Sequence, residues 1–291
     1  MSVTTIAITG ATGFVGRSLC RAIEARGMGL RRLSTRAGAG LHTVNYEDVD
    51  SLMRALEGVD VVCHVAGRIN GSTAELVAAN LASTEAMIQA AGAVGLKRFV
   101  FVSSVAAAMG KGAYGRIKKQ AEDLLLNSDL PSVILRPTLI YGPGDDKNVA
   151  TMARTVRLSP VVPVLGGGGF KVQPVHVDDV VSVLIQSFEK PLPESIYNVC
   201  GPEQISLREM LVLIAGAMRR RRLFVPIPLG PVQKALLMYQ KVCPRTRLPV
   251  KQVAELDQHE AFDISATRRD FDFDPIPFAE GIARTAAAER W

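Results

Sequence analysis

The chain has 291 residues, of which 48% are hydrophobic and 5% aromatic, which allows one large or two modest domains with an aliphatic core. Its net charge of +6 is spread along the sequence; this suits a small anionic ligand and gives no support for a nucleic-acid partner. No uncharged apolar run reaches about 18 residues, no signal peptide is recognisable, and the four cysteines and four histidines lack metal-site spacing. We therefore expect a cytoplasmic protein with buried free thiols, no metal site and no membrane span.

Apolar runs that are typical of strands alternate with helix-like stretches up to Cys200. The predicted strands are 3–8, 30–34, 59–65, 97–103, 131–136 and 196–200. The predicted helices are 14–26, 48–57, 73–94, 113–128, 148–158, 177–189 and 206–220. This alternation calls for an α/β fold, a doubly wound parallel sheet with helices on both faces. We assign 1–141 to this domain, with 173–200 returning to it, and 142–172 and 201–291 to a smaller substrate-binding lobe.

A glycine-rich turn stands between the first predicted strand and the first predicted helix. It reads Ile8-Thr-Gly-Ala-Thr-Gly-Phe-Val-Gly16. Gly10 permits a tight turn, Gly13 lets the main chain approach a phosphate, and Gly16 lets the helix pack close to the strand. The free N–H groups at the helix start then face an anion. An ordinary strand-to-helix turn would explain the pattern less well than a Rossmann-type site for a dinucleotide pyrophosphate, lined by Gly10, Thr12, Gly13, Phe14, Val15 and Gly16.

The end of the second strand indicates which dinucleotide is bound. An acid there suits the ribose 2′-hydroxyl of NAD, whereas an arginine tolerates the 2′-phosphate of NADP. No Asp or Glu occurs between Ala25 and Tyr46. Four arginines do occur there: Arg26, Arg31, Arg32 and Arg36. A guanidinium can pair with a phosphate in a bidentate way, so we favour NADP over NAD, with Ser34, Thr35 and Arg36 at the phosphate, and expect the remaining arginines to be partly surface residues.

A hydroxyl, a phenol and an ammonium follow the fourth predicted strand. Tyr114 and Lys118 are four residues apart in a predicted helix and share a face. A neighbouring ammonium is expected to lower the pKa of the phenol, so that Tyr114 serves as general acid or base. Ser104, at the strand end, is expected to hydrogen-bond a substrate carbonyl beside Tyr114. Ligands bind at the carboxyl ends of such strands, which favours a catalytic role for these three residues.

Several further segments resemble the extended short-chain dehydrogenase/reductase family, also called the NAD(P)-dependent epimerase/dehydratase superfamily. The matching segments are Gly10–Gly16, His64–Gly67, Asn80 in Ala-Asn-Leu-Ala-Ser-Thr, Ser103-Ser104, Tyr114-x-x-x-Lys118, Leu135–Thr138, Tyr141–Gly144, His176–Val180, Tyr197–Gly201 and Phe262–Ser265. The resemblance implies a hydride-transferring Rossmann enzyme with a Ser-Tyr-Lys triad, often a homodimer. It also implies that the cofactor is lined by Asn45, Ala66, Gly67, Asn80, Val102, Pro137 and Thr138.

Departures from the family pattern bear on the substrate. Members that act on nucleotide sugars usually have Asn at the position of Leu139 and Arg at that of Val172. Both departures remove polar partners, so a smaller or more apolar carbonyl or alcohol substrate is favoured over a nucleotide sugar. Val105 and Ala106, where dehydratases of the family carry an acidic pair, disfavour dehydration. A nucleotide-sugar epimerase stays open as a second hypothesis.

The sequence leaves room for two more functions. Lys171-Val-Gln-Pro-Val175 resembles a loop in the NADPH-binding accessory subunit of respiratory complex I, which would make the chain a non-catalytic dinucleotide-binding or sensor subunit. The apolar stretch from Leu223 to Tyr239 follows the basic run Arg219–Arg222. It could contact a membrane surface, although a lid over a substrate pocket is the more common role of such a segment.

Overall fold

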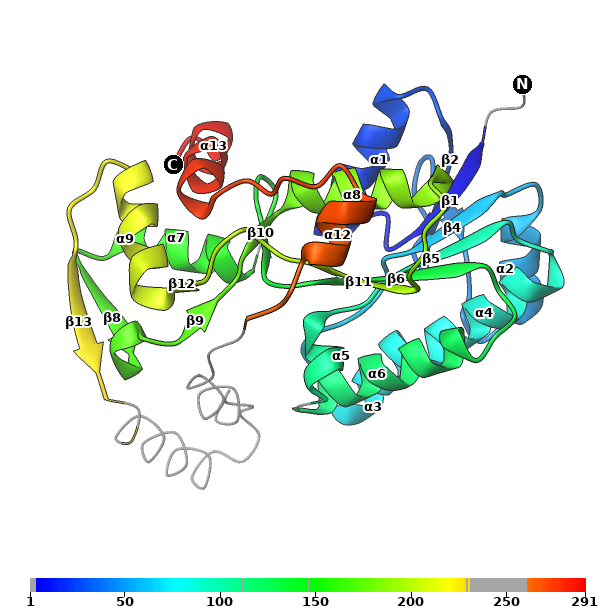
Figure 1. The fold of residues 1–291 in the computed structure, drawn as a ribbon, viewed down its shortest axis with the longest axis horizontal. Coiled ribbons are helices and arrows are strands. Elements are labelled where there is room, and N and C mark those ends of the chain that lie inside the picture. Colours follow the sequence, from blue (N-terminus) through cyan, green and yellow to red (C-terminus); the bar gives the residue numbers. More distant parts are fainter. Residues whose placement is uncertain (1–3, 111, 146, 229, 231–260) are drawn as a thin grey trace. The chain divides into compact units, whose positions relative to one another are not determined.

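The computed structural model describes residues 4–110, 112–145, 147–228, 230 and 261–291 (Figure 1). Backbone proximity divides the chain into two compact units. The first comprises Met1–Ile140, Val177–Cys200 and Phe262–Pro275. The second comprises Tyr141–His176, Gly201–Ala261 and Ile276–Trp291. The sequence placed all of 201–291 in the second lobe, whereas the structure groups 262–275 with the first unit.

The first unit is built on a seven-stranded sheet in the order β11-β6-β5-β4-β1-β2-β3, with every described pairing parallel. The strands are β1 (Thr5–Thr9), β2 (Gly29–Ser34), β3 (His42–Thr43), β4 (Val61–His64), β5 (Arg98–Val102), β6 (Ser132–Pro137) and β11 (Ile196–Val199). All six predicted strands are present, and the Rossmann-type fold class is confirmed. β3 was not predicted, because its two residues are exposed and carry no apolar signal.

Helices cover both faces of this sheet. They are α1 (Phe14–Ala25), α2 (Val49–Leu56), α3 (Thr73–Val77), the π-helical segment η1 (Ala78–Ala82), α4 (Ser83–Ala93), α5 (Val105–Met109), α6 (Gly112–Leu126), α8 (Val177–Glu189) and α12 (Ser265–Asp270). Helices α1 and α8 pack together on one face, and α2, α4 and α6 on the other (Figure 1). The doubly wound arrangement places every β-to-α turn at a strand's carboxyl end.

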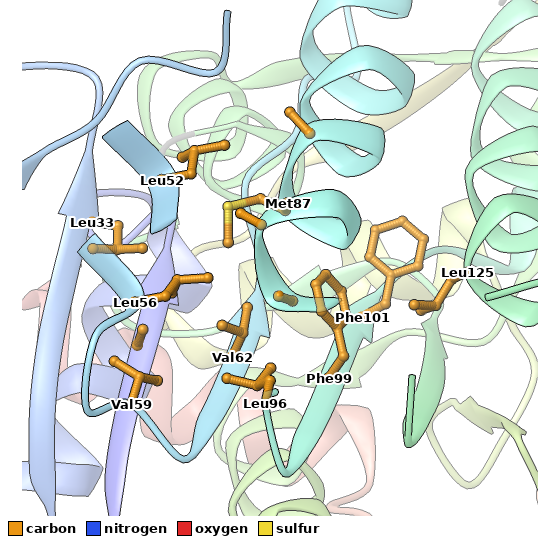
Figure 2. Close-up of a cluster of buried hydrophobic side chains, with 14 of the residues drawn as sticks. Leu33, Leu52, Leu56, Val59, Val62, Met87, Leu96, Phe99, Phe101 and Leu125 are labelled. Carbon is orange, nitrogen blue, oxygen red and sulfur yellow. The ribbon is translucent and has the colours of Figure 1, made fainter. Parts of the chain in front are cut away.

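The core under α2, α4 and α6 is aliphatic with two phenylalanines (Figure 2). Phe99 and Phe101 are two residues apart on β5 and therefore point to the same face of the sheet, where both are fully buried. Leu52 and Leu56, one turn apart on α2, close the other side of the cluster. Each such buried side chain stabilises the fold by about 1.5–3 kcal/mol, so this cluster fixes the sheet and the helices that carry the site.

The C-terminal segment 262–275 joins the first unit through a few specific contacts. The Tyr197 hydroxyl donates to the Asp270 carboxylate at 2.9 Å, and its ring meets the Phe271 ring edge-on with centroids 5.0 Å apart. The Thr267 hydroxyl donates to the Asn198 carbonyl at 2.6 Å. These long-range contacts to β11 explain why the segment's position could not be read from the local sequence.

The second unit contains shorter elements. They are β7 (Ile140–Tyr141, which begins at the boundary), α7 (Asn148–Leu158), β8 (Val161–Leu165), a 3-10 turn (Gly166–Gly168), β9 (Lys171–Val172), β10 (Val175–His176), β12 (Ile205–Ser206), α9 (Leu207–Ala217), β13 (Leu223–Ile227) and α13 (Phe278–Glu289). A capping box starts α9, in which Ser206 and Glu209 satisfy each other's backbone N–H groups. Helix α9 packs on α7 and α13. None of the described helices is both long and apolar enough to cross a membrane.

Candidate active site

The glycine-rich turn after β1 has the geometry of an anion cradle. Gly10 has φ +66°, and a Cβ there would lie 2.9 Å from the Ala66 backbone. A Cβ on Gly16 would lie 2.1 Å from the Gly10 carbonyl oxygen, so only glycine lets α1 start this close to the turn. No side chain caps α1, and Thr12 and Gly13 are exposed beside its first N–H groups. Phe14 and Val15 are partly exposed there. The turn therefore fits the two-phosphate group of a dinucleotide.

The four arginines beside β2 have different environments. Arg31 donates to the carbonyls of Ala55 and Glu57, and Arg32 pairs with Glu24. Arg26 donates to a carbonyl of its own helix. Arg36 is exposed, and its side chain has no hydrogen bond or ion pair within the described residues. Among the four, it is the guanidinium without such a contact in the described part of the chain.

Ser34 and Asn45, both predicted from the sequence, flank that position. Ser34 ends β2, and its hydroxyl accepts the backbone N–H of Arg36 at 3.0 Å, which orders the segment through Thr35. Asn45 lies after β3 and is exposed. Its side-chain oxygen accepts the backbone N–H of Glu47 at 3.0 Å, while its amide nitrogen faces no described partner. These groups lie at the carboxyl ends of β2 and β3, where an adenosine moiety would be expected.

A chain of hydrogen bonds runs under the loop that follows β4. The Thr84 hydroxyl donates to the Asn80 carbonyl at 2.7 Å, so it can only accept from His64 Nε2, at 3.2 Å. His64 Nδ1 then accepts from the Thr9 hydroxyl at 2.8 Å. Thr9 in turn accepts the backbone N–H of Ala66 at 3.1 Å and shares a hydrogen bond with the Tyr46 hydroxyl. In this hydrogen-bond network the neutral His64 ring therefore carries its proton on Nε2, and the Thr9 hydroxyl donates to Nδ1.

The imidazole of His64 is neutral as a result. Burial, together with the charge of Lys118, lowers the pKa of His64 to about 3. Such a group neither donates nor accepts protons at neutral pH. Its place in the chain indicates a structural role, which is to hold the β4 loop at Ala66 against β1.

Asn80 holds the same loop from the other side. Its amide nitrogen donates to the carbonyls of Arg68 and Leu76, both at 2.9 Å, and its oxygen accepts the Arg68 N–H at 3.1 Å. A Cβ on Gly67 would lie 2.7 Å from that oxygen. The side chain is 1% exposed. Sequence reasoning placed Asn80 among the residues that line the cofactor, and in the structure its amide positions the exposed Gly67 loop.

Ser104 and Tyr114 meet at the carboxyl end of β5. Ser104 caps α5, where its hydroxyl accepts the N–H of Ala106 at 3.2 Å. A Cβ on Gly115 would lie 2.4 Å from the Ala106 carbonyl oxygen, so this glycine lets α6 approach α5 closely. The approach brings the Tyr114 hydroxyl into a hydrogen bond with the Ser104 side chain. Gly115 was missed, because nothing local marks a glycine one residue after Tyr114 as a packing contact.

The pKa of Tyr114 differs from the sequence-based expectation. Burial raises it to about 12, and the hydrogen bond with Ser104 opposes this only in part. We expected the Lys118 ammonium to lower it. Instead, Lys118 Nζ donates to the Val102 carbonyl at 2.9 Å and lies 4.0 Å from the centre of the Phe101 ring. Lys118 is 2% exposed, and burial lowers its own pKa to about 7.

A second buried charge lies one turn beyond Lys118 and was not predicted. The Glu122 carboxylate is fully buried and accepts from the Ser103 hydroxyl and, in a bidentate pair, from the Arg136 guanidinium. The remaining predicted residues lie nearby on the same edge: Pro137 ends β6, and the N–H of Thr138 donates to the Val199 carbonyl of β11 at 3.4 Å. Ser103, Glu122 and Arg136 therefore join β5, α6 and β6 beneath the site.

Comparisons with known proteins agree with this geometry. The model of the NAD dependent epimerase/dehydratase family matches residues 6–200. Ceramide reductase of Caulobacter vibrioides is 35% identical over 198 residues, which span 64% of this chain and 62% of that protein's length. The 2-alkyl-3-oxoalkanoate reductase of Stenotrophomonas maltophilia is 26% identical over 326 aligned positions, covering 97% of this chain and 98% of that protein. The UDP-glucose 4-epimerase of Thermus thermophilus, solved with NAD, superposes with a TM-score of 0.78 at 22% identity and 99% coverage of both chains, a likeness of fold.

Proposed function

Since the chain belongs to the NAD dependent epimerase/dehydratase family, we propose that it is a reductase that uses NADPH to reduce an apolar carbonyl compound. The family membership predicted from the sequence motifs is confirmed, and with it the class of NAD(P)-dependent oxidoreductases and epimerases. The direction of the reaction, the cofactor preference and the substrate are the proposal.

The observation that carries it is the hydrogen bond between Ser104 and Tyr114 at the end of β5, with Lys118 one turn further on. The glycine-rich turn would hold the pyrophosphate of a nicotinamide cofactor, which would supply the hydride for the carbonyl carbon. The Ser104 hydroxyl donates a hydrogen bond to the carbonyl oxygen. Tyr114 Oη then transfers its proton to that oxygen, which completes the alcohol and leaves a phenolate.

The protonated phenol of Tyr114 suits the role of acid in a reduction. With a pKa of about 12 the phenol is protonated at neutral pH and can act as an acid, whereas alcohol oxidation would need the phenolate first. Lys118, whose pKa is lowered to about 7 by burial, can take up and release a proton near neutral pH.

The preference for NADPH rests on Arg36. It is the exposed guanidinium after β2 whose side chain has no described protein partner, and no carboxylate follows that strand in the sequence up to Tyr46. A 2′-phosphate would gain a charge-assisted pair there. The three described cysteines, Cys20, Cys63 and Cys200, are buried free thiols, and we place the enzyme in the reducing cytoplasm.

The preference for an apolar substrate rests on Leu139 and Val172, which stand where relatives that bind nucleotide sugars carry polar residues. The names of the two reductases above also support it. We favour an enzyme over an accessory subunit because Ser104, Tyr114 and Lys118 are present together and the first two are hydrogen-bonded.

The test is NADPH oxidation measured with a panel of carbonyl compounds and with UDP-glucose. We expect turnover of a 2-alkyl-3-oxoalkanoate or another long-chain ketone, loss of that turnover in Tyr114→Phe, and a higher KM for NADH than for NADPH. Interconversion of UDP-glucose with UDP-galactose, without oxidation of NADPH by any long-chain ketone, would overturn the proposal in favour of an epimerase.

A further inference from the structure

One face of the second unit is apolar and exposed. Strands β8 and β13 pair in parallel, with Leu223 opposite Val161 and Val225 opposite Pro163. Leu223 is 63% exposed and Val161 45%. The alternate residues Val162 and Val164 point to the other side and are buried. One side of this strand pair packs into the core of the second unit, so the apolar side chains on its other side stay exposed to solvent.

The carboxyl end of α7 extends this face. The N–H of Leu223 donates to the Pro160 carbonyl at 3.0 Å. The Arg222 guanidinium donates to the carbonyls of Val156, at 2.5 Å, and Arg157, at 3.2 Å. These bonds place the last turn of α7, with Leu158 at 71% exposure, beside the start of β13. We call Leu158, Val161, Pro163, Leu223 and Val225 the apolar face.

Positive charge with no ion-pair partner among the described residues adjoins the apolar face. Across 147–176 and 201–228 the sequence has nine Lys and Arg residues against two acids, Glu203 and Glu209. Glu209 is engaged in the capping box of α9. Five exposed arginines on or next to the elements of the apolar face form no ion pair within the described residues: Arg154, Arg157, Arg219, Arg220 and Arg221.

We propose that the apolar face and these arginines dock the protein on a membrane surface that contains anionic lipid headgroups. Aliphatic side chains can enter the headgroup boundary while the arginines beside them pair with phosphates. A protein partner is less well matched, since interface hot spots are enriched in aromatic residues and this face has only leucine, valine and proline. Of the stretch Leu223–Tyr239 singled out in the sequence, residues 229 and 231–239 lie outside the described part and contribute nothing to the proposal.

The proposal is independent of the reductase assignment, since none of these residues belongs to the Ser104–Tyr114–Lys118 site. It is tested by co-sedimentation of the full chain with vesicles of phosphatidylcholine alone or with one quarter phosphatidylglycerol. We expect binding to the second kind only, weakened at high salt. The triple variant R219Q/R220Q/R221Q should lower the partition coefficient by about 100-fold, since each arginine near an anionic surface contributes about a factor of five.

Matched controls separate docking from general charge and folding effects. Replacing three exposed arginines of the first unit, R21Q/R26Q/R54Q, should change the partition coefficient less than about threefold. L158S/L223S should lower it by about tenfold, whereas L124S/L126S, two exposed leucines on α6, should not. Thermal midpoints of all variants should stay within a few degrees of wild type.

Three outcomes would overturn the proposal: no binding of the wild type to either vesicle, an equal loss in R21Q/R26Q/R54Q, or a dimer in light scattering that L158S/L223S dissociates. The last outcome would assign the apolar face to a second copy of this chain.

Discussion

Two buried charges one turn apart on α6 have opposite environments. Glu122 is fully buried, and both of its oxygens are satisfied by Ser103 and the bidentate Arg136. Lys118 is equally buried, but it has one neutral carbonyl and the face of a phenylalanine ring as partners. The Glu122 carboxylate thus has a complete set of hydrogen-bond donors, whereas for Lys118 the effect of burial outweighs the attraction of Glu122 and lowers the pKa toward the neutral form. The contacts of Glu122 stabilise the fold, whereas Lys118 can gain or lose a proton near neutral pH.

The largest effect is expected at the reacting end of this helix. Tyr114→Phe removes the proton donor, so kcat should fall roughly 10³-fold while the Kd for NADPH stays within about twofold. The measurement is steady-state turnover together with calorimetric titration of NADPH. Tyr197→Phe is the matched control, because it removes a hydroxyl that bonds Asp270 on the same unit and should leave kcat unchanged. Turnover that survives in Tyr114→Phe would remove this residue from the mechanism.

Substitution of Glu122 is expected to lower the free energy of unfolding. Glu122→Ala leaves the Arg136 guanidinium without its counter-ion, and the free energy of unfolding should fall by about 3–5 kcal/mol. Asp123→Ala, one residue further along, breaks the exposed pair with Lys119 and should cost under about 0.5 kcal/mol. Urea unfolding followed by circular dichroism measures both. Equal losses of unfolding free energy in the two variants would mean that burial does not make the Glu122–Arg136 pair more stabilising than the exposed pair.

The cofactor side gives a smaller effect. Arg36→Ala should raise the Kd for NADPH by about 10- to 100-fold and that for NADH by less than about threefold, since a charge-assisted pair with the 2′-phosphate is lost. Arg26→Ala, just after α1, should alter neither constant. Fluorescence titration with both nucleotides decides; parallel weakening of both would place Arg36 away from the phosphate.

A further prediction concerns Lys118 and pH. Its folded pKa of about 7 lies below the ordinary lysine value of 10.5, so between these pH values the unfolded chain binds the proton and the folded one does not. The free energy of unfolding should therefore rise with pH in this window, by up to about 1.4 kcal/mol per pH unit from this group. Lys118→Met should lose that rise. Urea unfolding of the cofactor-free protein at pH 7, 8 and 9 tests this, and parallel pH profiles of the two proteins would show that Lys118 keeps its ordinary pKa.

The elements of the first unit were predictable where the signal is local. Continuous apolar runs such as Phe99–Val102 announce buried parallel strands, and the glycine spacing of Gly10–Gly16 announces the turn. The predicted helix 73–94 is in fact divided by η1, where Asn80 and Thr84 bond to backbone carbonyls one turn earlier in the chain. These hydrogen bonds depend on the position of the surrounding loop, so the division of the helix could not be predicted from the sequence.

The site itself was predicted as residue types and spacing, but not as electrostatics. The spacing of Tyr114 and Lys118 places both on α6, yet the direction of Lys118 Nζ toward β5 follows from tertiary packing. The ion pair of Glu122 with Arg136 joins elements that have no local pattern in common. In the second unit, Pro160 and Pro163 read as loop signals, although β8 runs through Pro163 and pairs with β13.

The most direct test is a paired titration of NADPH into wild-type protein and Tyr114→Phe, followed by a single turnover with a long-chain 3-oxo substrate. Equal affinity in both proteins, with substrate reduction in the wild type alone, is the predicted result. Absence of heat on addition of either NADPH or NADH to the wild type would contradict the nucleotide site at Gly10–Gly16, and equal reduction rates would contradict proton donation by Tyr114.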